Sequence, residues 1–132
     1  MCKVIERDPG EFLQSYVADD VHWTVSGPFK KTHPLAGVYN SREEFKQNTF
    51  VPLSGRFDGG LKLRVVDVIS QFPSRPGDPV KVCIELEGVA TLKKGQNEWR
   101  NYYSWVMHFK EEKAVTVRAY LDSAIVNEAM AD

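Results

Sequence analysis

The residues best suited to chemistry lie near the C-terminus, in the stretch VTVRAYLDSAIV (115–126). Arg118, Tyr120 and Asp122 occur there at every second position, among residues typical of a β-strand. Alternate side chains of a strand point to the same face of a sheet. These three side chains therefore either face water together or line one wall of a cavity, where a guanidinium, a phenol and a carboxylate could bind a ligand and move a proton.

The preceding β-rich run decides between these possibilities if a tight turn at Glu111-Glu112 joins it to the last strand. Residues directly opposite each other in an antiparallel pair share a face. The resulting register places Asn101 opposite Asp122, Tyr103 opposite Tyr120, and Trp105 opposite Arg118. Two Tyr and one Trp on one face are too much aromatic surface to leave in water. We therefore expect a cavity over this face, closed by a helix that carries Phe45 and Phe50.

A carboxylate beside aromatic walls can take up and return a proton near neutral pH, because burial disfavours its charged form. We accordingly assign Asp122 as the catalytic acid or base. Asn101 would orient it, and Tyr103 or Tyr120 would donate a hydrogen bond to a developing oxyanion. The alternative is that Asp122 only ends a strand at the surface.

Other polar residues have two interpretations each. Arg118 either contacts a ligand oxygen or stacks on Trp105. Glu85 and Glu87 either bring a second carboxylate to the cavity or lie on a solvated sheet face. His33, in the loop before Pro34, either reaches the mouth of the cavity or lies at the surface.

The elements that must position these side chains follow from the spacing of apolar and turn-forming residues. Asp8-Pro9 begins a short helix that ends near Val17, HWTV (22–25) is a strand, and 29–40 is a loop. A capping box at Ser41 begins the main helix, which Pro52 interrupts. Four β-rich runs follow, at about 61–72, 80–92, 97–109 and 114–124. Helices followed by an antiparallel meander predict one α+β domain over 1–132, with the helices on one face of the sheet.

Composition excludes several classes of protein. The chain is 42% hydrophobic and 27% charged, as globular proteins are. Its net charge is −1 and its basic residues are scattered, so we do not expect nucleic acid as a partner. From this sequence we expect neither a membrane span nor a secretory signal. Cys2 and Cys83 lie far apart, which fits a reducing compartment and predicts a cytoplasmic protein. The three histidines lack metal-ligand spacing and no phosphate-binding loop is present, so we expect no metal and no other cofactor.

Four segments together resemble the NTF2-like superfamily and, within it, the SnoaL-like proteins: ADDVHWTVSG (18–27), GVYNSREEFKQNTFVPL (37–53), EWRNYYSWVMHF (98–109) and VRAYLD (117–122). The resemblance covers nearly the whole chain in the same order of elements. It implies a cone-shaped α+β fold, in which a curved antiparallel sheet wraps around helices and encloses a pocket. It also implies a homodimer through the outer face of the sheet.

Within this family, polyketide cyclases, ketosteroid isomerases and epoxide hydrolases use pocket carboxylates without a cofactor. Asp122, Asn101 and Trp23 match positions of the family's motifs, whereas an Asp-Arg-Asp set like that of the epoxide hydrolases is not identifiable. We expect a small apolar or polycyclic, oxygen-bearing ligand, which the protein isomerises, cyclises or hydrolyses. The alternatives are a ligand-binding or protein-interaction module without catalysis, and a structural dimer with a filled core. The expected binding residues are Trp23, Phe45, Phe50, Tyr103, Trp105 and Arg118.

Overall fold

A computed structural model describes all residues from 1 to 132. The N-terminal half carries most of the helices: α1 (Cys2–Arg7), α2 (Pro9–Tyr16), α3 (Arg42–Phe45), η1 (Lys46–Phe50) and α4 (Val51–Ser54). The strands are β1 (Val17–Val25), β2 (Gly37–Tyr39), β3 (Phe57–Gln71), β4 (Val80–Leu92), β5 (Glu98–Lys110) and β6 (Lys113–Leu121). The last helix is α5 (Ser123–Met130).

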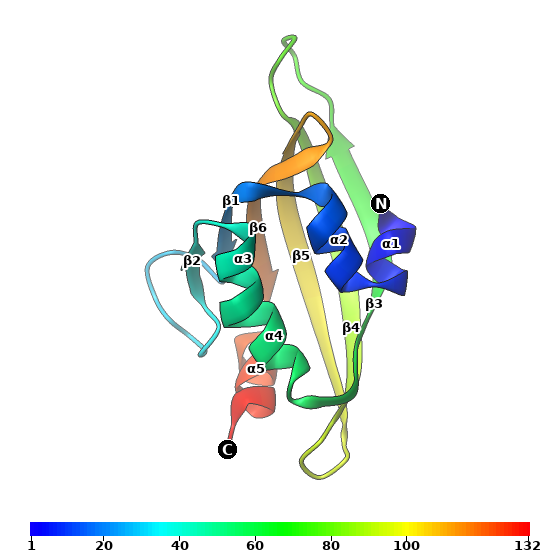
Figure 1. The fold of residues 1–132 in the computed structure, drawn as a ribbon, viewed down its shortest axis with the longest axis vertical. Helices are drawn as coiled ribbons and strands as arrows, with labels where there is room; N and C mark the ends of the chain where they lie inside the picture. The colour runs from blue at the N-terminus through cyan, green and yellow to red at the C-terminus, as the bar shows by residue number, and fades with distance from the viewer.

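The six strands form one sheet in the order β2-β1-β6-β5-β4-β3. Every neighbouring pair is antiparallel except β1 and β6, which run parallel. Helices α1 to α4 lie over one face, here called the inner face, while the β3–β4 hairpin projects beyond the rest of the molecule (Figure 1). The predicted α+β architecture, with helices on one face of a curved sheet, is therefore confirmed.

Two helices are absent from the sequence prediction. Helix α1 precedes the expected start at Asp8, and α5 replaces the last part of the strand expected to reach 124. The start of α5 has a clear local cause. Asp122 accepts hydrogen bonds from the backbone N–H groups of Ala124 and Ile125, as an N-cap residue does. The same chemistry begins α2, where the Asp8 carboxylate accepts from Gly10 and Glu11.

The expected main helix is present, but it is divided into α3, η1 and α4. The Ser41 hydroxyl caps α3 by accepting from the N–H of Glu44. Pro52 has no N–H to donate, and just before it the Val51 N–H reaches back to the carbonyl of Lys46, five residues earlier. The segment Lys46–Phe50 is thereby a π-helix, a wider turn that often occurs at functional sites.

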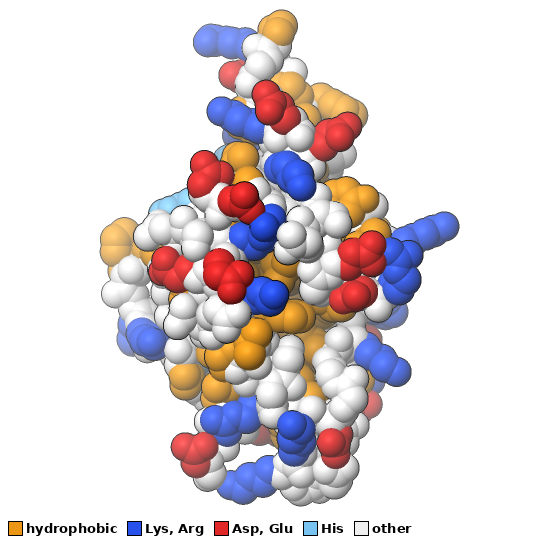
Figure 2. Space-filling model, viewed as in Figure 1, with side chains coloured by type: hydrophobic (Ala, Val, Ile, Leu, Met, Phe, Trp, Pro, Cys, Tyr) orange, Lys and Arg blue, Asp and Glu red, His pale blue; other side chains and the backbone are white.

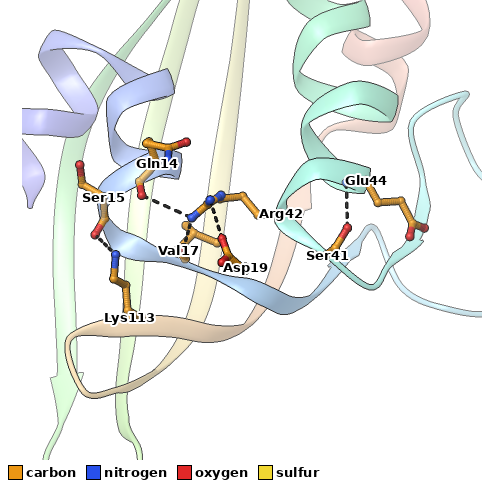
Figure 3. A network of polar contacts seen from close by, with 8 residues as sticks. All are labelled: Gln14, Ser15, Val17, Asp19, Ser41, Arg42, Glu44 and Lys113. Atoms are coloured by element: carbon orange, nitrogen blue, oxygen red, sulfur yellow. Dashed lines mark hydrogen bonds and ion pairs between the residues drawn. The ribbon is translucent and has the colours of Figure 1, made fainter.

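Arg42 fixes the position of this helical segment against the start of the sheet (Figure 3). Its guanidinium donates to the carbonyl of Val17 at 2.9 Å and pairs with the Asp19 carboxylate. Nearby, the Lys113 ammonium donates to the carbonyl of Ser15 at 2.8 Å (Figure 3). These contacts join α3, the α2–β1 junction and the β5–β6 turn, and so hold the helices over the inner face.

The β5–β6 hairpin corrects the register expected from the sequence. The turn between the two strands is the expected two-residue turn. Lys110 lies opposite Lys113, and Glu111 and Glu112 both have positive φ. The pairing then shifts by one residue, because Phe109 pairs with Ala114 while His108 pairs with Thr116. This bulge turns every later residue of β6 to the opposite face from the one expected.

Candidate functional site

A cavity of about 70 Å³ lies between the helices and the inner face of the sheet. It is lined by 17 residues, 15 of them hydrophobic, contributed by the helices, the β1–β2 loop and the sheet. Five of the expected binding residues line it: Trp23, Phe45, Phe50, Tyr103 and Trp105. Hydrophobic side chains are visible near the middle of the helix-covered face, between α2 and α4 (Figure 2). The site is thus an apolar cavity under the helices.

Aromatic rings build much of the cavity wall. Trp23 stacks on Phe45 with ring centroids 3.8 Å apart and meets Trp105 edge-on at 5.6 Å. Tyr103 and Trp105 alternate along β5, so both point to the inner face, with centroids 6.3 Å apart. Such contacts fix ring orientations as well as bury area. The aromatic wall expected from β5 is therefore present.

Three buried polar atoms have no hydrogen-bond partner: Trp23 Nε1, Thr49 Oγ1 and the Tyr103 hydroxyl. All three belong to residues that line the cavity. Thr49 was not expected from the sequence. It lies four residues after Phe45 in the helical segment, and this spacing could have placed both on one face. Three residues of the lining thus carry unpaired polar atoms, which are covered by other atoms while the cavity surface itself is apolar.

Tyr103 owes its place to a glycine on the neighbouring strand. A Cβ at Gly88 would lie 2.9 Å from Tyr103 Cε2 and 3.3 Å from its hydroxyl oxygen, so the ring occupies the space that a side chain would fill. Burial raises the pKa of the Tyr103 phenol well above its ordinary value. The hydroxyl therefore keeps its proton at neutral pH.

Arg118 and Tyr120 do not belong to the cavity. The bulge pairs Arg118 with Val106 and Tyr120 with Ser104, all on the outer face of the sheet. Tyr120 is 47% exposed. The inner positions of β6 hold Val117, Ala119 and Leu121 instead, which avoids burying a guanidinium without a partner. Opposite Trp105 lies Ala119, not Arg118, so the proposed stacking of Arg118 on Trp105 is also wrong.

Asp122 and Asn101 occupy structural positions at the start of α5. The Asp122 carboxylate is exposed and caps the helix at 3.0 Å and 3.4 Å from the N–H groups of Ala124 and Ile125. Asn101 is buried, and it bonds to the backbone carbonyl and N–H of Asp122, both at 3.2 Å. The expected contact therefore involves the Asp122 backbone rather than its carboxylate. Neither residue lines the cavity.

Glu87 lies on the outer face, opposite Tyr102 rather than Asn101. It pairs with Arg100 at 2.9 Å and with Arg64 at 3.5 Å. Bonds to Tyr102 and to these two guanidinium groups lower the pKa of Glu87, although desolvation, the largest single influence, opposes them. Glu85 also borders this outer face, so neither glutamate supplies a carboxylate to the cavity.

His33 lies inside the β1–β2 loop and is only 3% exposed, so the surface interpretation is wrong. Its Nδ1 accepts from the N–H of Leu35 at 3.1 Å, which leaves Nε2 to donate to the Ser26 hydroxyl at 2.9 Å. A histidine with this tautomer cannot accept the Ser26 proton, so the pair is not an activated nucleophile. His33 instead shapes the loop whose Leu35 lines the cavity.

The titratable side chains form no cluster of three or more His, Cys, Asp or Glu that could hold a metal ion. The helices are all too short or too polar to cross a bilayer.

No protein-family model and no curated protein matches the sequence. Solved structures do match it over almost its full length. An NTF2-like protein from Burkholderia thailandensis E264 is 20% identical, with a TM-score of 0.70 over 98% of this chain and 92% of the other. TerC, co-crystallised with polyporic acid, is 18% identical, with a TM-score of 0.70 over the same 98% and 92%.

A candidate SnoaL-like polyketide cyclase from Jannaschia sp. CCS1 is 11% identical, with a TM-score of 0.63 over 92% of this chain and 78% of the other. At these identities the matches establish the fold. The resemblance stated from the sequence is confirmed at this level, and the chain has the NTF2-like fold shared by SnoaL-like proteins.

Proposed function

We propose that the protein binds a small, largely apolar molecule in the cavity between the helices and the inner face of the sheet. The observation that carries this proposal is an apolar cavity, three of whose lining residues, Trp23, Thr49 and Tyr103, each hold a buried polar atom without a partner. Small-molecule sites are typically apolar cavities with a few polar groups that orient the ligand.

The fold comparison supports the same function. TerC, whose fold this chain shares over nearly its whole length, was co-crystallised with polyporic acid. The comparison supports binding of a small organic molecule without specifying which one this protein takes.

Binding is better supported than the carboxylate chemistry expected from the sequence. The residues that line the cavity include no Asp, Glu or His, and Tyr103 is their one titratable group. A general acid or base must lie within hydrogen-bonding reach of the proton that it moves. Asp122 lies outside the lining and caps a helix, so we propose a binding module rather than an acid/base enzyme.

The size of the cavity limits the ligand. Its volume of about 70 Å³ is roughly half of the 150 Å³ of an engineered cavity that holds benzene. A ligand with a ring therefore requires a lining side chain to move. Phe50 is suited to this, because it is half-buried and lies at the end of the π-helix.

Filling the cavity tests this function. Ala119 lines the cavity, whereas Thr116 lies on the opposite face of the same strand. We expect Ala119→Leu to abolish binding of the apolar probe indane, measured by titration with NMR detection, and Thr116→Leu to preserve it. Circular dichroism checks that both variants fold. If overpacking unfolds Ala119→Leu, Ala119→Val adds a smaller side chain at the same position. Binding of indane that is equal in all variants, or absent from the parent protein, would contradict the proposal.

We also propose a homodimer through the outer face of the sheet. A groove on this face is lined in part by Val66, Tyr102 and Tyr120, three large side chains that are exposed in the monomer. Burying these side chains against a second copy would stabilise a symmetric pair. Light scattering at micromolar concentration is expected to give twice the monomer mass, and the monomer mass would contradict it.

We place the protein in a reducing compartment, the cytoplasm. The support is that Cys2 and Cys83 are both free thiols. Fractionation of cells that express the tagged chain tests this assignment. Recovery in a secreted fraction would contradict it.

A further inference from the structure

We infer that the ligand of this cavity is uncharged and carries an oxygen that accepts hydrogen bonds, recognised by the indole N–H of Trp23 and the hydroxyls of Tyr103 and Thr49. The inference rests on the proposed function and specifies the chemical class of the ligand. It differs from the expected ligand in naming the recognition groups and in excluding charged compounds.

The three groups are deeply buried and come from separate elements. Trp23 on β1 is 0% exposed, Thr49 in η1 is 8% exposed, and Tyr103 on β5 is 7% exposed. None of the three polar atoms has a partner within the protein. Buried polar groups are nearly always hydrogen-bonded, so each exception requires an explanation. All three residues line one cavity, whose surface is apolar in the ligand-free protein. A ligand that displaces a lining side chain such as Phe50 would reach these atoms and supply the missing bonds.

Comparable groups elsewhere in the molecule are satisfied. The indole N–H of Trp99 donates to the carbonyl of Ile125 at 2.8 Å, and the hydroxyl of buried Tyr39 donates to the carbonyl of Leu35 at 2.7 Å. Asn101, also buried, makes three bonds to backbone groups. The fold therefore pairs its buried Trp, Tyr and Asn side chains in general, and the unpaired Trp and Tyr are both at the cavity.

The chemistry of the groups selects an acceptor. An indole N–H can only donate, so Trp23 requires an acceptor atom on the ligand. The Tyr103 phenol keeps its proton and can donate in the same way. Thr49 can donate or accept, which leaves room for a ligand hydroxyl beside the acceptor oxygen.

The lining also selects against charge. It includes no Asp, Glu, Lys, Arg or His. A carboxylate or an ammonium group would lose its hydration in this cavity and meet no counter-ion, which is strongly unfavourable. Neutral ketones, lactones, quinones and similar compounds satisfy the donors without this penalty.

Four probes that share the indane skeleton test the inference: indane, 1-indanone, 1-aminoindane and indane-1-carboxylate. Indanone adds one carbonyl to indane, while the other two carry a positive or a negative charge at pH 7. We expect indanone to bind up to about tenfold more tightly than indane, as one good hydrogen bond allows. Both charged probes should bind at least about tenfold more weakly than indanone.

The indole N–H resonance of Trp23 reports the contact directly, and its absence from the Trp23→Phe spectrum assigns it. Indanone should move this resonance downfield, whereas indane should not. Tyr103→Phe should reduce the preference for indanone over indane. Tyr39→Phe should keep it, because Tyr39 does not line the cavity and its hydroxyl is already paired with the Leu35 carbonyl.

Each outcome is decisive. If indane and indanone bind equally without a downfield shift, or if a charged probe binds best, the inference is wrong while the proposed binding function stands. Failure of all four probes to bind contradicts the proposed function, and with it the inference.

Discussion

Replacing Tyr103 by Phe should stabilise the ligand-free protein, the opposite of the usual result for a buried residue. The Tyr103 hydroxyl is buried without a partner. Leaving such a group unsatisfied costs about 1–3 kcal/mol. Phe keeps the ring against Gly88 and removes only the oxygen. We expect a gain of about 1 kcal/mol, at the lower end of that range because the oxygen also loses its packing contacts.

Tyr39→Phe is the matched control. Tyr39 is buried to the same degree, 9% against 7% exposed, but its hydroxyl donates to the carbonyl of Leu35 at 2.7 Å. Removing it leaves that carbonyl without this bond, which should cost about 1–3 kcal/mol. The two substitutions delete the same atom and should therefore change stability in opposite directions.

Thermal unfolding measures the difference. An unfolding entropy of about 2.1 cal/mol/K per residue means that 1 kcal/mol shifts the Tm of a chain of this length by about 4 °C. Tyr103→Phe should raise the Tm by about 4 °C, and Tyr39→Phe should lower it by roughly 4–11 °C. A Tyr103→Phe variant that is destabilised as much as Tyr39→Phe would show that the Tyr103 hydroxyl is satisfied, and would refute the reasoning.

Three further substitutions test other parts of the structure. Asp122→Ala should lower the free energy of unfolding by about 1 kcal/mol through loss of the α5 cap, without changing the affinity for indane. Asp122→Asn should be nearly neutral because Asn also caps helices. Chemical denaturation measures the stability of each variant, and titration measures its affinity for indane. Burial lowers the pKa of His33 below 6.5, so the unfolded chain binds a proton first as the pH falls. Stability should accordingly be full above about pH 6.5 and decline below it. His33→Gln should reduce this loss of stability, measured by unfolding curves between pH 7.5 and 5.5. The part due to His108, whose pKa is also lowered, should remain. A loss of stability as large as in the parent protein would contradict this. Gly88→Ala should destabilise the protein by about 1–3 kcal/mol, since its Cβ would lie 2.9 Å from Tyr103 Cε2, and an unchanged Tm would show that the ring moves freely.

Much of the architecture was predictable because it depends on local chemistry. The capping residues Asp8 and Ser41 begin helices as expected. The strand β5 presents Tyr103 and Trp105 to the cavity, because alternation within a single strand needs no knowledge of its neighbours. Trp23, Phe45 and Phe50 were also correctly expected to line the cavity.

The expected positions of Arg118 and Tyr120 were wrong because a shift of one residue in the pairing decides which face of the sheet the side chains of a strand occupy. The turn at Glu111-Glu112 was predicted correctly, but the bulge beyond it is not encoded by a recognisable turn sequence. Its effect was to place Arg118 and Tyr120 outside the cavity. The alternation of Val117, Ala119 and Leu121 was the better guide, since apolar residues with period two indicate the buried face.

The expected position of the Asp122 carboxylate in the cavity was wrong for a related reason. A strand was expected to continue to 124, whereas Asp122-Ser123 followed by AIVNEAM is a helix start. Thr49, by contrast, could have been found from helical spacing alone. That its hydroxyl lacks a partner could not, because this depends on the surrounding three-dimensional packing.

The most direct test of the central claim is a crystal structure of the protein with 1-indanone. We expect the ligand between the helices and the inner face, with its carbonyl oxygen within hydrogen-bonding distance of Trp23 Nε1, the Tyr103 hydroxyl or Thr49 Oγ1. Indanone bound on the outer face beside Tyr102 and Tyr120, with the inner cavity empty, would contradict it.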